Sequence, residues 1–223
     1  MPWISCPWSS SDVAKGNVLE KTGFRDPASG GGLMISWYHL FVASYIAWIV
    51  MEVWIFRRDR RKSSGASGDR GSLIVLVVML TISLTGAWYA AAALPFARIV
   101  PVHFQLFLIG LALIWAGMAL RIWAILVLGR FFRTTVFVQA EHKLVETGPY
   151  RLLRHPSYTG TMLSLLGIGL ALGNWIAVAL LTLGPLPAYS YRIAVEERAL
   201  RARFGPQYEA FARDRWRLIP FLI

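Results

Sequence analysis

Long apolar runs separated by short polar loops constrain the fold of this chain more than any other feature. Leu33 to Phe56, Leu73 to Leu94 and Phe104 to Gly129 are each long enough, at about 1.5 Å per helical residue, to cross a hydrocarbon core about 30 Å thick. A fourth run from Tyr158 to Leu172 and a fifth from Trp175 to about Tyr191 are separated only by a Gly-Asn pair. The sequence therefore predicts an all-α integral membrane protein with about five transmembrane helices, the last two forming a tight helical hairpin.

Composition agrees with a membrane fold and limits the domain organisation. Of the 223 residues, 56% are hydrophobic and 16% are charged, which is outside the range of an ordinary soluble domain. At about 20 residues per crossing, five spans leave no room for a separate soluble domain. We expect a flexible N-terminal tail over 1–32, three transmembrane helices over 33–129 and a functional region over 130–223. Cys6 has no second cysteine and no neighbouring metal ligand, so we expect no metal site.

Basic residues predict the orientation. The loop 95–103 carries only Arg98, whereas the loop 57–70 carries six basic residues, which places the latter in the cytoplasm. The segment 130–157 and the C-terminus then also lie in the cytoplasm, and the N-terminus lies outside. The net charge of +11 thus reflects topology and attraction to the lipid bilayer, so we expect no nucleic-acid partner. The oligomeric state is left open by the sequence.

Polar residues directly before the fourth run suggest a binding site. Pro156 is suited to the opening turn of a helix, where its missing N–H has no intrahelical partner. The free amides of that turn, with Arg154 and His155 just upstream, would suit a carboxylate or a phosphate. The alternative is that Arg154 and His155 merely anchor the helix to lipid head groups.

A second polar group lies at the predicted inner end of the fifth run. Arg192 and Glu196 are four residues apart and share a helix face, while Glu197 is turned about 100° away. The hairpin would bring this face to the start of the fourth run, so the two ends could bracket one small ligand. The alternative is a snorkelling arginine and a solvated carboxylate at a membrane boundary.

Within the spans, a few residues predict local packing. Arg121 lies about eight residues inside the third span and should either snorkel or face a wet cavity. Glu52 is most simply a boundary residue. The spacing Gly169-x-x-x-Gly173 predicts close contact with the fifth helix. Pro185 and Pro187 should interrupt that helix, so it should pack against protein or a cavity rather than lipid.

The C-terminal half also resembles a known family. The residues that carry the resemblance are His142-Lys143-Leu144-Val145, Gly148-Pro149-Tyr150, Arg154-His155-Pro156-Ser157-Tyr158-Thr159-Gly160, Arg192, Glu196-Glu197, Leu200, Phe204-Gly205, Tyr208 and Ile219-Pro220. Together they closely resemble the isoprenylcysteine carboxyl methyltransferase family, over about residues 130–220. The Arg-His-Pro-x-Tyr element alone also occurs in membrane sterol reductases and phospholipid amine methyltransferases.

The resemblance implies a membrane methyltransferase that uses S-adenosylmethionine without a Rossmann domain. Its acceptor would be a carboxylate on a lipophilic small molecule or prenylated substrate. Arg192 would contact that substrate, and Arg192 and Glu196 would be the catalytic pair. The cofactor contacts carry over onto Gln139, His142, Lys143, Leu144, Val145, Tyr150, His155, Pro156, Ser157, Tyr158 and Glu196.

Other functions remain open from the sequence. A sterol-type reductase would bind NADPH with a similar Arg-His-Pro-x-Tyr region. A methyltransferase acting on phospholipids or thiols would share the cofactor but not the acceptor. A non-catalytic membrane protein could retain the fold without the chemistry.

Overall fold

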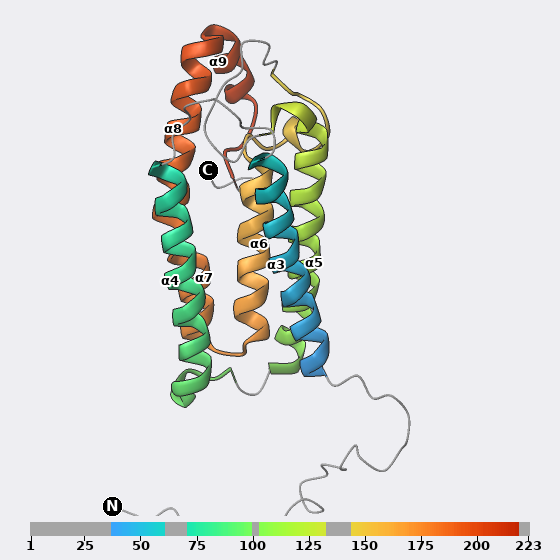
Figure 1. Cartoon of the computed structure of the whole chain (residues 1–223), viewed down its shortest axis with the longest axis vertical. Coiled ribbons are helices and arrows are strands. Elements are labelled where there is room, and N and C mark those ends of the chain that lie inside the picture. Colours follow the sequence, from blue (N-terminus) through green and yellow to red (C-terminus); the bar gives the residue numbers. More distant parts are fainter. Residues whose placement is uncertain (1–36, 61–70, 100–102, 133–143, 219–223) are drawn as a thin grey trace, which may run out of the picture. The chain divides into compact units, whose positions relative to one another are not determined.

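The described part of the chain is built from helices (Figure 1). The structure is a computed structural model, and it describes residues 37–60, 71–99, 103–132 and 144–218. The chain divides into two units, Met1–Leu40 and Phe41–Ile223. The α-helices are α3 Trp37–Arg60, α4 Gly71–Ala93, α5 His103–Leu128, α6 Pro156–Ala171, α7 Trp175–Leu183, α8 Leu186–Phe204 and α9 Pro206–Arg213. Short 3-10 helices cover Pro95–Ala97 (η2), Gly129–Phe131 (η3) and Gly148–Arg151 (η4).

Four segments of the described chain are long and apolar enough to cross a membrane. They are Trp37–Arg58, Gly71–Ala93, Phe104–Leu128 and Trp175–Phe204. The sequence predicts about five spans, and the fourth of these is not among the candidates. It corresponds to α6, which has 16 residues, fewer than the about 20 that a full crossing takes. The chain is therefore an all-α integral membrane protein with four candidate spans, and α6 is a shorter helix packed among them.

The hairpin predicted at the Gly-Asn pair is confirmed. Gly173 has φ 65°, a conformation that favours glycine, and it lets the chain reverse between α6 and α7. Asn174 then caps α7, because its Oδ1 accepts hydrogen bonds from the amides of Ile176 and Ala177. Its Nδ2 donates to the carbonyls of Ala90 and Leu94 at the end of α4, so one buried side chain joins the hairpin to another helix.

The predicted interruption of the last long helix is also confirmed. α7 ends at Leu183 and α8 begins at Leu186, with Pro185 and Pro187 at the start of the new helix. α8 does not end near Tyr191, as the hydropathy pattern predicts, but continues to Phe204. The polar residues of its second half therefore sit on one continuous helix.

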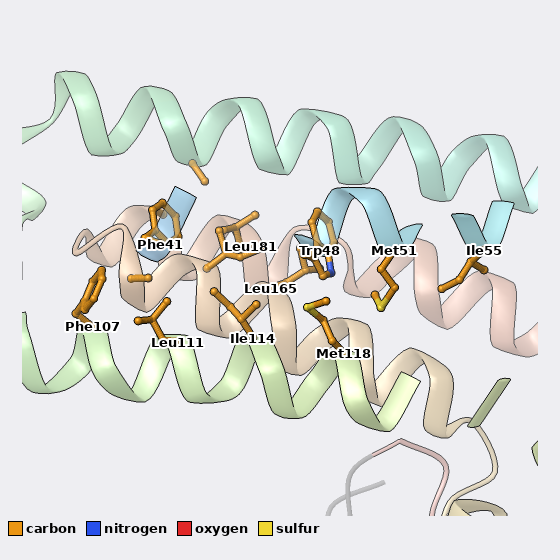
Figure 2. Close-up of a cluster of buried hydrophobic side chains, with 14 of the residues drawn as sticks. Phe41, Trp48, Met51, Ile55, Phe107, Leu111, Ile114, Met118, Leu165 and Leu181 are labelled. Atoms are coloured by element: carbon orange, nitrogen blue, oxygen red, sulfur yellow. The ribbon is translucent and has the colours of Figure 1, made fainter. Parts of the chain in front are cut away.

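Apolar side chains of the five helices α3 to α7 meet in one core. Figure 2 shows Phe41 and Trp48 of α3, Ile114 of α5, Leu165 of α6 and Leu181 of α7 pointing toward one another. Ile114 and Leu165 are fully buried. Because lipid tails are as apolar as these side chains, the gain comes from close packing rather than from leaving water.

The helices α5 and α6 approach each other closely. A Cβ added at Gly117 would lie 2.4 Å from the carbonyl oxygen of Gly160, and one added at Gly110 would lie 2.6 Å from that of Gly167. Each pair brings two backbones together where no side chain fits. The predicted contact of Gly169 is confirmed as well, since a Cβ there would lie 2.8 Å from Cα of Val178 on α7.

We expect Gly117→Ala to destabilise the folded protein by about 1–3 kcal/mol, because α5 and α6 would have to separate. The matched control is Gly86→Ala, whose new Cβ meets only the flexible Cδ1 of Leu180, at 3.3 Å. The measurement is the thermal unfolding midpoint of the purified protein in detergent. Equal midpoints for the two variants would contradict the proposed close approach.

Candidate functional site

The start of α6 and the second half of α8 meet in one cluster of charged side chains. His155 precedes the first turn of α6, and its Nδ1 lies 3.6 Å from Glu196 of α8. Its Nε2 lies 3.3 Å from the next carboxylate along α8, that of Glu197. The start of α6 and the second half of α8 therefore meet, as the hairpin predicts. The His155 side chain makes the contact, because it touches both neighbouring carboxylates.

The Glu196 carboxylate lies among residues from both helices. The Tyr158 hydroxyl donates a short hydrogen bond to its Oε1. Arg192, one turn earlier on α8, approaches the same oxygen with its Nη2 at 3.4 Å. The Glu196 side chain is 22% exposed to solvent, so this carboxylate has protein partners and is still accessible to a ligand.

The Glu197 carboxylate is enclosed more completely. Its side chain is 1% exposed and lies 3.0 Å from Nη1 of Arg154, 2.9 Å from Nη2 of Arg217 and 3.5 Å from Nη2 of Arg201. Such a buried charge is tolerated because it is paired on several sides. Helix geometry turns this residue about 100° away from the face of Arg192 and Glu196, and the sequence predicts no role for it. Its only sequence signal is its place beside Glu196 in the family motif.

Arg154 does not serve as the open anion ligand that the sequence suggested. Its Nη1 donates to Glu197, and its Nε donates to the carbonyl of Arg215 at 3.1 Å. The residue instead joins the start of α6 to α8 and to the C-terminal segment.

Arg192 is almost fully buried, and each of its three nitrogens has a partner. Nε donates to the Tyr158 hydroxyl at 2.8 Å, and Nη1 donates to Oγ of Ser72, at the start of α4, at 3.1 Å. Nη2 lies near Glu196. The hydroxyls of Tyr158 and Ser72 are neutral acceptors, and a charged acceptor would bind the guanidinium more strongly.

The C-terminal segment is paired with the chain that leads into α6. The Arg154 amide donates to the carbonyl of Trp216 at 2.8 Å, and the His155 amide donates to that of Arg217 at 3.2 Å. The side chain of Arg217 then reaches Glu197. This segment thus fixes both the backbone and the charge of the cluster.

Beside the cluster, Tyr150 and Leu144 lie near a pocket. Tyr150 in η4 is buried, and its carbonyl accepts a hydrogen bond from Nε of Arg215 at 3.0 Å. Burial raises the pKa of the Tyr150 hydroxyl, so it stays neutral. The pocket has a volume of about 640 Å³. It is lined by Leu144, Glu146, Phe204, Gln207, Ala210, Phe211, Asp214 and Arg215.

The expected cofactor residues are placed as follows. His155, Pro156 and Tyr158 lie at the start of α6, in or beside the cluster. Ser157 points elsewhere, toward Arg121 of α5. Val145 is partly buried next to Leu144. Gln139, His142 and Lys143 lie outside the described residues. Among the described residues, no group of three or more His, Cys, Asp and Glu side chains is arranged to hold a metal ion.

His155 gives the cluster a pH dependence. Burial would lower the pKa of His155, but its contacts with Glu196 and Glu197 outweigh this and raise the pKa above its ordinary 6.5. Protonated His155 therefore stabilises the fold fully below pH 6.5, and this contribution is lost as the pH rises through the higher pKa of the folded state.

We expect the thermal midpoint of the protein in detergent to fall between pH 6.5 and the folded-state pKa, and this fall to be smaller in His155→Gln. Glutamine keeps a hydrogen-bonding side chain but cannot become charged. The measurement is a series of melting curves from pH 6 to pH 9 for both proteins. An unchanged slope in the variant would show that another group titrates.

Comparisons with known proteins agree with this region. The family described as "Phospholipid methyltransferase" matches residues 106–207. The chain is 34% identical over 116 residues to a "Probable protein-S-isoprenylcysteine O-methyltransferase" of Oryza sativa subsp. indica, covering 51% of this chain and 61% of that protein. It is 34% identical over 122 residues to "Protein-S-isoprenylcysteine O-methyltransferase B" of Arabidopsis thaliana, covering 54% and 62%. The chain thus spans less than two thirds of these relatives.

A solved structure shares the fold. It is described as the eukaryotic intramembrane Ras methyltransferase ICMT, and it superposes with a TM-score of 0.59 at 24% sequence identity. The similarity covers 83% of this chain and 65% of that one. At this sequence identity, the similarity shows a shared fold and nothing further.

Proposed function

We propose that this chain, which matches the phospholipid methyltransferase family over residues 106–207 and is similar to protein-S-isoprenylcysteine O-methyltransferases, transfers a methyl group from S-adenosylmethionine to a lipophilic carboxylate. The observation that carries the proposal is the meeting of His155 and Tyr158 from α6 with Arg192 and Glu196 from α8. These are residues that the family motif assigns to cofactor and substrate.

The residues present fit the cofactor. S-adenosylmethionine has an apolar adenine, a diol, a carboxylate and a cationic sulfonium. Leu144, Val145 and Tyr150 would hold the adenine, and protonated His155 would attract the methionine carboxylate. Glu196 is anionic and partly exposed, so it suits the diol or the sulfonium charge. Gln139, His142, Lys143, Pro156 and Tyr158 complete the proposed cofactor contacts, whereas the Ser157 side chain, also expected there from the sequence, is directed to Arg121.

When bound, S-adenosylmethionine supplies an electrophilic methyl group on a positively charged sulfur. A carboxylate acceptor needs no general base, because it is already an anion at neutral pH. The chain must therefore align the acceptor and exclude water. Arg192 can do this by exchanging a neutral hydroxyl partner, that of Ser72 or Tyr158, for a carboxylate oxygen, since charge-assisted hydrogen bonds are about twice as strong.

Glu196 limits how tightly Arg192 holds the acceptor. Its carboxylate already shares the guanidinium and accepts from Tyr158, so the acceptor would bind to a partly neutralised arginine. A fully unshared arginine would reduce the nucleophilicity of the bound carboxylate. We assign Arg192 to orienting the acceptor and Glu196 to moderating that contact.

The names of the relatives support an isoprenylcysteine-type acceptor, and the distribution of basic residues supports a cytoplasmic site with the N-terminus outside. The family description names phospholipids, which would make an amine the acceptor instead. Incubating membranes with labelled cofactor and matched lipophilic carboxylates, thiols and amines would separate these, and we expect methyl ester formation.

We expect the purified full chain to bind S-adenosylhomocysteine, the product form of the cofactor, and not NADPH. The measurement is calorimetric titration of the protein in detergent with each ligand. Binding of NADPH alone would favour a sterol-type reductase. Binding of neither would favour a non-catalytic membrane protein and would overturn the proposal.

We expect Arg192→Gln to lower kcat by about 100-fold, because the acceptor would lose its charged partner. Glu196→Gln should also lower the rate and weaken S-adenosylhomocysteine binding. The control is Arg198→Gln, an exposed arginine on the same helix whose Nε donates to the backbone carbonyl of Ala194. Melting curves show whether each variant is folded. Near wild-type rates in a folded Arg192→Gln protein would refute the assigned role.

A further inference from the structure

A second charged pair lies inside the helix bundle. Arg121 of α5 approaches Glu52 of α3, with Nη2 to Oε2 at 2.8 Å. The side chains are 12% and 27% exposed, respectively. The sequence predicts that Arg121 either snorkels or faces a wet cavity, and that Glu52 is a boundary residue. The structure shows instead that they pair with each other across two helices.

The other terminal nitrogen of Arg121 reaches the start of α6. Nη1 donates to the carbonyl oxygen of Ser157 at 3.1 Å, to Oγ of Ser157 at 3.1 Å and to Oγ1 of Thr161 at 2.6 Å. Ser157 and Thr161 lie one turn apart on the same face of α6. One guanidinium therefore joins α3 to the first two turns of the helix that carries the site.

Those turns also carry the side chains of the cluster. Tyr158 follows Ser157 directly, and its hydroxyl contacts Arg192 and Glu196 on α8. The first turn of α6 is thus held from one side by Arg121 and contributes to the cluster from the other. A displacement of that turn would move Tyr158 relative to Glu196.

The pair is poorly suited to stabilising the fold alone. Oε1 of Glu52 and Nε of Arg121 are buried without a hydrogen-bond partner among the described residues. Incompletely satisfied buried charges add little net stability, since desolvation offsets their attraction. Charged residues within membrane spans are rare and mostly functional.

We propose that Glu52 and Arg121 are positioning residues that hold the first turn of α6 in place for the site formed with α8. The expected effect of this positioning on catalysis rests on the proposed function. Glu52 holds the guanidinium, and the guanidinium holds Ser157 and Thr161. Neither residue touches the cluster itself in the contacts described. An error of about 1 Å in placing a reacting group is enough to lower catalysis strongly.

The test compares Glu52→Gln, Arg121→Gln and the double variant, using the full chain in detergent. We expect each single variant to bind S-adenosylhomocysteine about tenfold more weakly. The double variant should be no weaker than either single one, because both changes break the same connection. Arg121→Lys should recover part of the affinity, since an ammonium can still donate to Ser157 and Thr161.

The matched control is Glu209→Gln. Glu209 pairs with Arg201 at 2.8 Å, the same distance as in the proposed pair, but both side chains are about half exposed. An exposed pair contributes little, so this variant should bind S-adenosylhomocysteine as the wild type does.

Hydrogen exchange separates positioning from general stability. We expect the amides of 157–161 to exchange faster in Glu52→Gln, while the rest of α6 and the melting midpoint stay unchanged. Uniformly faster exchange along α6 with a lower midpoint would show a purely structural pair and would overturn the proposal. Unchanged exchange and unchanged affinity would also overturn it. If the wild type binds no S-adenosylhomocysteine, the proposed function fails, and local exchange alone decides whether the pair holds this turn.

Discussion

The sharing of two adjacent carboxylates between α6, α8 and the C-terminal segment is the interaction on which the site depends. His155 touches both Glu196 and Glu197, and Arg217 reaches Glu197 from the other side. Removing one partner of a buried charge typically costs about 3–5 kcal/mol, because the remaining charge is left without compensation. The ends of the two helices therefore cannot separate without a large loss of stability, so these charged contacts hold α6 and α8 together.

The two carboxylates have different surroundings, which supports different roles for Glu196 and Glu197. Glu197 is enclosed by arginines and is almost completely buried, so it has no capacity left for a ligand. Glu196 keeps 22% of its side-chain exposure and is contacted by one arginine, a tyrosine hydroxyl and the shared imidazole. The buried contacts of Glu197 hold this part of α8 in place and so position the adjacent Glu196. This supports assigning the ligand contacts to Glu196 rather than to its neighbour.

Local sequence signals predicted much of the fold, because they act within a few residues. Pro156 begins α6 as predicted, and the Gly173-Asn174 pair turns the chain between α6 and α7. Each of these preferences needs no knowledge of distant residues. The structure has four candidate spans where the apolar runs predict about five, because hydropathy alone does not separate the short, buried α6 from a full crossing.

Contacts between distant residues could not be predicted in the same way. Arg121 and Glu52 are 69 positions apart, and their pairing depends on how α3 and α5 pack. The same holds for Glu197, whose partners come from three separate parts of the chain. A pattern of charges shows which residues require partners in a membrane protein, but not which partners they find.

The charge of the cluster bears on the choice of acceptor. Two carboxylates, Glu196 and Glu197, lie among the arginines and the imidazole described above, so positive charge exceeds negative charge among the described residues of the cluster. Low dielectric at a membrane boundary strengthens this excess. A carboxylate entering beside Arg192 would reduce it, whereas a protonated amine would increase it and would have to lose its proton before accepting a methyl group. The electrostatics thus support the proposed carboxylate acceptor over an amine, and they leave Glu196 as the anionic group available to a cationic sulfur.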